Sequence, residues 1–400
     1  MSIIVQKYGG SSVSDVEKLK KIAHIISVVK QQGHDVVVVV SAMGKNTNQL
    51  IEMAQSLSSN PERRELDMLL STGERITMAL LCIALNDLGV KAISLTGSQS
   101  GIITNDRYND ASVIEVRPFR VQDELAKGQV VVIGGFQGVS YKRDITTLGR
   151  GGSDTTAVAL AASLNAERCE IYSDVDGVYT TDPNLIKDAK HLPEISYEQI
   201  QEMAEAGAKV LNAQAVQFAK KSKIAIYARS TFESARETII REMAPTGKQE
   251  VIGVVQKNDI TRIIFKNKDI HIHLDEFFTF LEEKNIPVKE LHYIQHRSID
   301  IENISFVISK INVHNWKEVA KELVIKYKND ISIDETLGAV SLIGEGFSRD
   351  NRLIIETISL LNSNKIEFFG LTTTSFRISL LVKKEILHNV VEIMHNYWIK

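Results

Sequence analysis

Over residues 1–240, short runs of hydrophobic residues alternate with longer segments in which hydrophobic positions recur at helical spacing. The short runs are near-continuous, as in strands that are buried on both faces, and the longer segments between them predict helices. This alternation is typical of a mostly parallel sheet covered by helices, so the first part of the chain is predicted to be α/β. Strands are expected at 3–6, 35–42, 91–95, 129–136, 169–174 and 223–228.

The first predicted helix, at 14–32, has clear signals at both ends. Ser14 and Glu17 have the spacing of a capping box, in which two side chains satisfy amide groups at the start of a helix. Gly33 is the residue type that most often ends a helix, because it adopts the left-handed conformation without strain.

The pattern changes at 241–250, REMAPTGKQE, and the segment after it contains a repeat. The strand-like run ISFVISK at 304–310 is echoed by ISLLVKK at 378–384, and each is followed by a helical pattern. Upstream, a helix-then-strand pattern at 277–288 is echoed at 358–369. Two copies of a strand, helix, strand, strand, helix unit fit this segment. The predicted domains are 1–240, 250–335 and 336–400, the last two as separate units or interleaved.

Composition and charge narrow the class of protein. Hydrophobic residues make up 44% and charged residues 24% of 400 residues, as in an ordinary globular chain of more than one domain. A net charge of -3 gives no basic surface for nucleic acid, so no nucleic-acid partner is expected. The N-terminus lacks the pattern of a signal peptide, and no apolar run reaches the roughly 20 residues of a membrane span. A cytoplasmic protein without a membrane partner is expected, with Cys82 and Cys169 reduced.

The first strand leads directly into Lys7, Tyr8, Gly9 and Gly10. Adjacent glycines let backbone amides approach an anion, the next helix offers its positive N-terminus, and the lysine adds a charge. A plain strand-to-helix turn with a solvated lysine is the alternative interpretation. The position at the first crossover of an α/β sheet favours a ligand site.

The glycine-rich loop TTLGRGGSDTT at 146–156 combines Arg150 with Asp154. Arg150 can hold a carboxylate through two parallel hydrogen bonds, and Asp154 can accept from an amino group. Together they fit an amino acid better than a nucleotide, although Asp154 alone is equally typical of a helix N-cap. Thr47 and Glu74 follow other strand-to-helix transitions, and each singly is more typical of a cap or surface residue.

The segment YSDVDGVYTTDPN at 172–184 gathers Asp174, Asp176 and Asp182 after a buried strand, as a polar binding loop does. Calcium is an alternative, but the spacing is not that of an EF-hand loop. Lys209 lies in a helical stretch and could belong to a solvated helix face.

Taken together, these motifs resemble those of the aspartate kinases. QKYGGSSV, STGER, GFQGV, TTLGRGGSDTT, YSDVDGVYTTDP and GAKVL occur in the order that this family shows, and the resemblance covers the whole first domain. It implies the amino-acid kinase fold, a three-layer αβα arrangement with a mostly parallel central sheet, followed by two small α+β ACT domains of order βαββαβ. The type implied is monofunctional and bacterial.

The resemblance implies that MgATP phosphorylates the side-chain carboxylate of L-aspartate, the first step toward lysine, threonine, methionine and diaminopimelate. Catalysis is assigned to Lys7, Asp154 and Lys209. The metal is expected to be carried by ATP, without dedicated protein ligands. The ATP-binding residues implied are Lys7, Tyr8, Gly9, Gly10, Ser173, Asp174, Tyr179, Asp182, Lys209 and Val210. The aspartate-binding residues implied are Ser41, Thr47, Glu74, Arg150, Gly151, Gly152, Ser153 and Asp154.

The ACT repeats imply a homodimer or higher homo-oligomer and an amino-acid effector, such as lysine, threonine or diaminopimelate. The sequence departs from the family at Asn212 and Ala213, where His and Pro are frequent, and at the first ACT turn, which has no glycine. In the second repeat, Gly344 and Gly346 are retained. Which effector binds, if any, is therefore open.

Three alternatives remain at this point. Another amino-acid kinase, acting on acetylglutamate, glutamate or a nucleoside monophosphate, would lack this joint set of motifs. A sensor built from a degenerate kinase domain would have no chemical need for Lys7, Arg150, Asp154 and Lys209 together. A structural scaffold has only the repeats in its favour.

Overall fold

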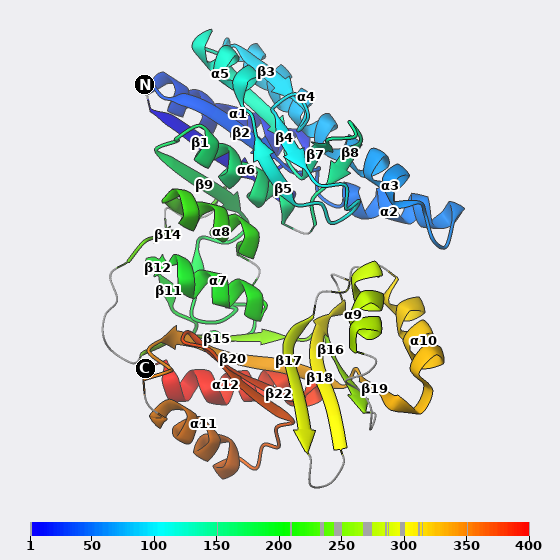
Figure 1. Cartoon of the computed structure of the whole chain (residues 1–400). Helices are drawn as coiled ribbons and strands as arrows, with labels where there is room; N and C mark the ends of the chain where they lie inside the picture. The colour runs from blue at the N-terminus through cyan, green and yellow to red at the C-terminus, as the bar shows by residue number, and fades with distance from the viewer. Residues whose placement is uncertain are drawn as a thin grey trace. The chain divides into compact units, whose positions relative to one another are not determined.

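The computed structural model describes the chain except for residues 1, 150, 209, 233–235, 244–249, 267–273, 285, 287, 297–300, 311–312, 314, 350 and 400. The chain divides into two compact units (Figure 1). The first consists of Met1–Tyr179, Lys190–Glu205 and Lys209–Thr246, and the second of Thr180–Ala189, Ala206–Ala208 and Gly247–Lys400.

The first unit is built on an eight-stranded sheet of order β12-β14-β13-β9-β1-β2-β6-β3. Its strand pairs are parallel except β13 with β14. The apolar runs predicted as strands lie in this sheet, and the predicted α/β class is confirmed. Its strands are β1 Ile3–Tyr8, β2 Asp35–Val40, β3 Ala92–Leu95, β6 Val130–Gly134, β9 Arg168–Ser173, β12 Glu194–Ser196, β13 Ile226–Ser230 and β14 Glu237–Arg241.

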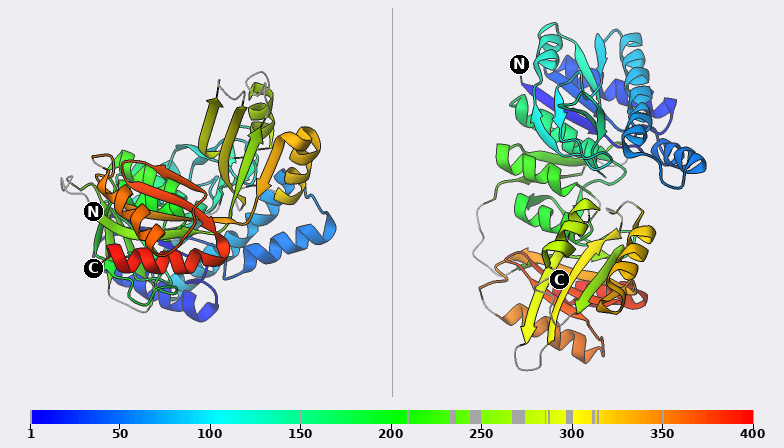
Figure 2. Two further views of the ribbon diagram at one scale, coloured as in Figure 1. Left: turned by 90° about the horizontal axis from the view of Figure 1, so that it is seen from below. Right: turned by 45° about the vertical axis from the view of Figure 1, so that its right-hand side comes forward.

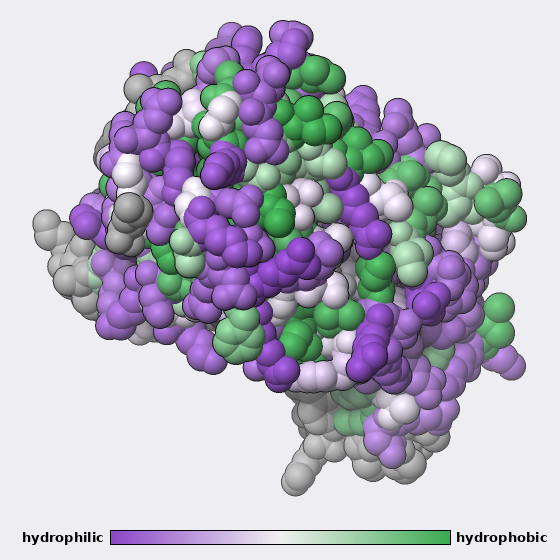
Figure 3. Space-filling view, turned by 90° about the horizontal axis from the view of Figure 1, so that it is seen from above, coloured by the Kyte–Doolittle hydropathy of each residue, from purple (hydrophilic) through white to green (hydrophobic). Residues whose placement is uncertain are grey.

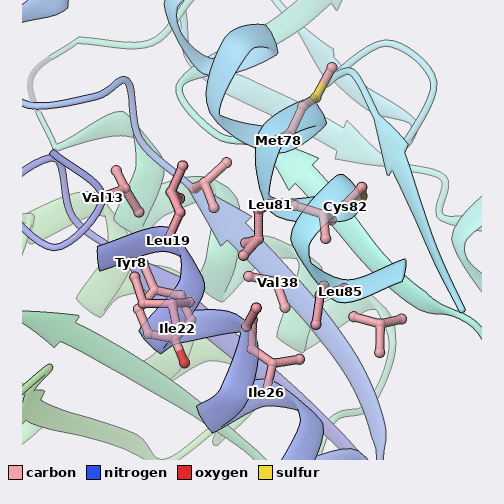
Figure 4. Packing of buried hydrophobic residues seen from close by; sticks show 14 of the residues in the cluster. Tyr8, Val13, Leu19, Ile22, Ile26, Val38, Met78, Leu81, Cys82 and Leu85 are labelled. Carbon is pink, nitrogen blue, oxygen red and sulfur yellow. The ribbon is translucent and has the colours of Figure 1, made fainter. Parts of the chain in front are cut away.

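Helices cover this sheet on both faces. On one face, α1 and α4 pack against alternate residues of β2 and β6, and Figure 4 shows Leu19, Ile22, Leu81 and Leu85 meeting Val38 there. Successive side chains of a strand point to opposite faces, so the remaining valines face α6, which contacts β1, β2 and β9. The helices are α1 Val16–Gln31, α2 Asn46–Leu57, α3 Arg63–Leu70, α4 Thr72–Asp87, α5 Phe119–Ala126, α6 Gly152–Ser163, α7 Tyr197–Ala206 and α8 Ala213–Ser222.

The first helix begins later than the capping box predicts. Asp15 is the N-cap, and its carboxylate accepts from Lys18 N at 2.9 Å. The Ser14 hydroxyl donates to the Asp15 carboxylate instead. The prediction of a Ser14–Glu17 capping box was therefore wrong, because the neighbouring aspartate caps the same amides with a charged acceptor. Gly33 has φ +91, as expected for the residue that ends the helix.

A smaller sheet of order β5-β4-β7-β8 completes the first unit, together with the two-stranded pair β10 and β11. The small sheet leads into the glycine-rich loop, because β8 ends three residues before position 150. The strands are β4 Ile102–Thr104, β5 Val113–Val116, β7 Gln137–Ser140, β8 Ile145–Thr147, β10 Val178–Tyr179 and β11 His191–Leu192.

The second unit contains two four-stranded antiparallel sheets, each covered by two helices. The first has the sheet order β17-β18-β16-β19 and the chain order βαββαβ of an ACT domain. Phe277 and Leu323 of its helices pack on Phe265 and Phe306 of its strands. Its elements are β16 Ile260–Lys266, α9 Leu274–Glu283, β17 Lys289–His296, β18 Ile301–Ser309, α10 Trp316–Tyr327 and β19 Ile331–Asp334.

The second ACT sheet has the order β15-β20-β22-β21, so its outer strand comes from a segment that precedes the first ACT domain. The two repeats are thus interleaved in the chain. The echoed strand runs form β18 and β22, which hold equivalent places in the two sheets. Figures 1 and 2 show α12 lying along β15 and β20. The elements are β15 Glu250–Lys257, β20 Leu337–Glu345, α11 Arg352–Ser363, β21 Gly370–Thr373, β22 Arg377–Lys383 and α12 Leu387–Trp398.

Residues 180–189 follow the polar loop of the first unit in sequence but group with the second unit. Thr180 O accepts from Val254 N of β15 at 2.7 Å, and the Thr180 hydroxyl lies 2.9 Å from His395 Nε2. Ile186 is buried in the core of the second ACT sheet. These contacts attach the segment to the second ACT sheet and its helix α12.

One stretch, Arg63–Asp87, is long and apolar enough for a membrane span by length and composition, with a mean hydropathy of 1.5 and half of its best window buried. In the structure it comprises two helices, α3 and α4, and α4 packs into the core through Leu81 and Leu85. A buried helix in the core of a protein meets the same criteria of length and composition. On the face shown in Figure 3, hydrophobic residues lie in small groups among hydrophilic ones.

Candidate active site

The ends of β1, β2 and β9 meet at one edge of the large sheet. Gly9 N donates to Tyr172 O of β9 at 3.1 Å, and Gly44 N, after β2, donates to Gly10 O at 3.0 Å. A Cβ at Gly10 would lie 3.0 Å from Ala42 O, so a side chain there would crowd the close approach of two loops. Ligands of α/β proteins bind outside this carboxyl edge of the sheet.

Lys7 and Asp154 form an ion pair at this edge. Lys7 lies near the end of β1, next to the centre of the sheet, and Asp154 lies in the first turn of α6. Lys7 Nζ is 2.7 Å from Asp154 Oδ1, and each side chain is only 11% exposed. The helix N-cap is Gly151, with φ +74, so the N-cap interpretation of Asp154 was wrong. Its carboxylate points to the lysine and not to the helix amides.

Small residues around the start of α6 bring it close to the neighbouring loops. A Cβ at Gly152 would lie 2.6 Å from the Leu148 side chain. The Ser41 hydroxyl, after β2, donates to Ser153 Oγ at 3.1 Å. The helix N-terminus therefore faces the loop after β2, where its partial positive charge favours an anion.

Glu74 is a buried carboxyl group in the first turn of α4. It is 3% exposed, and Oε1 accepts from Ala42 N at 3.1 Å. Oε2 is buried and has no hydrogen-bond partner among the residues that the structure describes. Burial raises the pKa of Glu74 to about 7. An unsatisfied buried carboxyl oxygen is rare in folded proteins and is typical of a group that binds a ligand. Thr47 lies nearby in sequence, partly exposed in the first turn of α2.

The polar loop after β9 divides between the two units. Ser173 ends β9, and its carbonyl accepts from both the amide and the hydroxyl of Thr231. The Thr231 hydroxyl also lies 2.6 Å from Ser12 Oγ, which ties the loop after β13 to the loop after β1. Sequence reasoning missed Thr231, because nothing in the pattern around it marks a site.

The aspartates of this loop are not gathered into one cluster. Asp174 is exposed, Asp176 accepts from the Tyr179 hydroxyl at 2.7 Å, and Asp182 accepts from Asn184 N at 2.9 Å within the second unit. Among the described residues, no three His, Cys, Asp or Glu side chains could hold a metal ion together. The calcium alternative thus has no support in the described part of the loop.

Two predicted site residues, Arg150 and Lys209, lie outside the described residues. Val210, beside the latter, is partly buried. Asn212 is the N-cap of α8 and accepts from Gln214 N at 2.8 Å and from the Thr155 hydroxyl at 3.4 Å. The departure from the family at Asn212 thus has a local reason, since asparagine is among the best N-cap residues.

This geometry places a lysine, glycine amides, the N-terminus of α6 and a buried carboxyl group around one edge of a parallel sheet. Such a set can hold phosphate and an amino acid side by side. A model of the amino acid kinase family matches residues 2–230, more than half of the chain. The chain therefore belongs to the amino acid kinase family.

Relatives that match this chain over nearly its full length narrow the class of protein further. An aspartokinase of Bacillus sp. (strain MGA3) is 40% identical, and the match covers 99% of this chain and 97% of the relative. Aspartokinase 2 of Bacillus subtilis (strain 168) is 38% identical with the same coverage of each. Within the family, the chain belongs to the aspartokinases and is a kinase. The resemblance that the motifs indicated is confirmed.

Solved structures agree with the fold. E. coli aspartokinase III in complex with aspartate and ADP, in the R-state, has a TM-score of 0.86 at 24% identity and covers 100% of both chains. Aspartate kinase from Synechocystis has a TM-score of 0.56 at 31% identity, over 99% of this chain and 69% of that chain. The predicted amino-acid kinase fold with two ACT domains is confirmed.

Proposed function

We propose that the chain transfers the γ-phosphoryl group of ATP to the side-chain carboxylate of L-aspartate, giving 4-phospho-L-aspartate. The observation that carries the proposal is the Lys7–Asp154 pair beside the Gly9–Gly10 turn and the N-terminus of α6. The names of the full-length relatives and the aspartate and ADP bound to E. coli aspartokinase III support it.

On the nucleotide side, Gly10 would offer its backbone amide to the phosphates while Lys7 neutralises charge. Gly9, whose amide donates to Tyr172 O, would let the phosphates approach closely because it has no side chain. Ser173, Asp174, Tyr179, Asp182 and Val210 are proposed to contact the nucleotide, and Lys209 to neutralise the group in transfer. Mg²⁺ would be held by the phosphates of ATP, since phosphate oxygens are ligands that it prefers. The ion supplies further charge neutralisation.

On the aspartate side, the unpaired oxygen of Glu74 is well suited to an ammonium group. Arg150 would hold the α-carboxylate, and Ser41, Thr47, Gly151, Gly152, Ser153 and Asp154 would complete this part of the site. The side-chain carboxyl of aspartate has an ordinary pKa near 3.9, so the nucleophile is ionised at neutral pH and no general base is required. The residues of this chain must align two anions and stabilise their charge.

We further propose that the reaction is the first step toward lysine, threonine, methionine and diaminopimelate in the cytoplasm, and that the ACT domains bind an amino-acid effector. Lysine bound to E. coli aspartokinase III in its T-state supports the latter. In the second repeat, a Cβ at Gly344 would lie 1.9 Å from Glu250 O, so this glycine is required by the pairing with β15. Its retention is therefore no evidence of an effector. A homodimer or higher homo-oligomer is proposed, to be tested by light scattering.

The proposal is tested by a hydroxylamine trap, in which purified protein is incubated with MgATP and L-aspartate and aspartyl hydroxamate is scored. Acetylglutamate and glutamate serve as alternative carboxyl acceptors, and UMP is followed by ADP release because its phosphorylation gives no hydroxamate. Lysine, threonine and diaminopimelate serve as effectors. Hydroxamate from aspartate alone is expected. Folded protein that binds ATP and forms no hydroxamate would favour the sensor interpretation.

The Lys7→Met variant tests the catalytic role of the Lys7–Asp154 pair in the hydroxamate assay. It should lower kcat by about a hundredfold or more, because a preorganised charge at the transferring group is lost. Lys20→Met is the matched control, since this lysine pairs with Glu17 on the surface of α1 and its side chain is 60% exposed. Near-normal turnover of folded Lys7→Met protein would contradict the role.

A further inference from the structure

Asp67, on α3, is a fully buried carboxylate that no motif marked. Within the described part of the chain, its side chain accepts hydrogen bonds from Asn109 and Thr147. Asn109 N lies 3.0 Å from Oδ1 and 3.1 Å from Oδ2, and Asn109 Nδ2 lies 2.5 Å from Oδ1. Thr147 N lies 2.9 Å from Oδ2, and its hydroxyl lies 2.5 Å from Oδ1. A buried charge without a cation is costly, so this dense set of donors is needed to hold it.

Both partners of Asp67 lie at the base of the glycine-rich loop. Thr147 is the last residue of β8, and its carbonyl accepts from Ala111 N at 3.0 Å. Asn109 has φ +67, a backbone conformation that costs energy unless its surroundings hold it. The next residue, Asp110, approaches Gly149 so closely that a Cβ there would lie 2.5 Å from Asp110 Oδ1. The carboxylate of Asp67 thus clamps 109–111 against 147–149.

The far end of the same loop is held by different contacts. There, Gly151 is the N-cap of α6, and Asp154 pairs with Lys7. The loop is therefore anchored on one side by Asp67 and on the other by the site itself. A shift of about 1 Å at its base would be enough to misplace groups that bind a substrate.

We propose that Asp67 is a positioning residue that sets the glycine-rich loop for binding of the amino-acid substrate. The inference rests on the proposed function, in which this loop holds aspartate. Because Asp67 is fully buried, it acts on the loop through its hydrogen bonds with Thr147 and Asn109. A merely structural role would lower stability and affect both substrates alike.

The test compares Asp67→Asn with the intact enzyme in the hydroxamate assay. An amide turns one acceptor into a donor that faces the donors of Thr147 and Asn109, so bonds to a charged acceptor are lost. The KM for aspartate should rise by about tenfold or more. The KM for ATP and the affinity for ADP should stay within about twofold, because the Gly9–Gly10 turn is held by other contacts.

Thr147→Val and Thr147→Ser keep the proposal testable if Asp67→Asn does not fold. The valine variant loses the hydroxyl and should raise the KM for aspartate severalfold, and the serine variant should restore it. Ser341→Ala is the matched control, because it removes a buried hydroxyl pair with Ser379 in the second unit. An unchanged KM for aspartate in folded Asp67→Asn or Thr147→Val protein, or an equal change for both substrates, would overturn the inference. Absence of hydroxamate from the wild-type enzyme would instead overturn the proposed function.

Discussion

At the scale of single residues, the candidate site stands out because its buried charges are incompletely satisfied by the protein. Lys7 and Asp154 neutralise each other, whereas one oxygen of Glu74 has no partner in the described part of the chain. Burial raises the pKa of Glu74 to about 7 from an ordinary value of 4.5. An ammonium group at the free oxygen would favour the charged form, so substrate binding and proton release are expected to be coupled.

Glu74→Gln tests this coupling. The KM for aspartate of the wild-type enzyme should rise as the pH falls below about 7, because the protonated carboxyl no longer attracts an ammonium group. The variant should have a higher KM that is nearly flat over the same range. Initial rates between pH 6 and 8.5 provide the measurement, and a wild-type KM that does not respond to pH would contradict the assignment.

The raised pKa of Glu74 also affects the stability of the folded enzyme. The folded pKa lies above the unfolded one, so the folded state binds more protons between the two values, and the wild-type enzyme loses stability as the pH rises through about 7. Without ligand, Glu74→Gln should therefore have the higher melting temperature above pH 7 and lose this advantage at low pH.

At the scale of elements, short polar signals decide where helices begin, and neighbouring polar residues compete for that role. Asp15 replaces the predicted Ser14 at the start of α1. The helix α6 has Gly151 as its N-cap and no side-chain cap, and its first amides donate to backbone carbonyls instead, Gly152 N to Gly149 O at 2.9 Å and Asp154 N to Gly151 O at 3.0 Å. By contrast, Asn212 caps α8 and also contacts Thr155 of α6. The cap thus joins two helices near the candidate site.

Asn212→Ala should destabilise the first unit by about 1 kcal/mol, the usual cost of a lost N-cap. Urea unfolding followed by the near-ultraviolet signal would show a lower midpoint. Asn212→Asp retains the capping oxygen and serves as the control. A midpoint equal to that of the wild type in the alanine variant would show that the amides find other acceptors.

At the scale of the whole molecule, two units with separate cores predict unfolding in more than one step. The core of the second ACT sheet includes Leu361 of α11, which is fully buried, together with residues of β20 and β22. The strand β15 completes this sheet although it precedes the other ACT domain in the chain. The two repeats therefore cannot be separated by a single cut.

Leu361→Ala should lower the stability of the second unit by about 2–5 kcal/mol, through lost burial and a residual cavity. Calorimetry should show one transition shifted and another, which ADP and aspartate raise, unchanged. Ile355→Ala is the control, because this residue lies on the same helix but is 59% exposed. A single transition that shifts as a whole would mean that the units unfold together.

Much of the architecture follows from the local pattern of hydrophobic and polar residues along the chain. The apolar runs of β1, β2, β6 and β9 predict buried parallel strands, and the echo between β18 and β22 predicts equivalent places in two sheets. The motifs after β1 and before α6 mark the candidate site in advance. Asp67 and Thr231 could not be predicted in this way, because each acts through partners that are distant in sequence and stands in no recognisable pattern.

The sequence by itself determined the type and order of the elements, the α/β class, the repeat and the family, since hydrophobic period, caps and motifs are properties of neighbouring residues. Only the tertiary structure decided that Lys7 pairs with Asp154, that β15 joins the last sheet, and that one Glu74 oxygen is buried with no partner among the described residues. These features depend on pairing between strands and on packing between distant segments. Burial then sets the free-energy cost of each charged group, and a group becomes buried only when the chain folds.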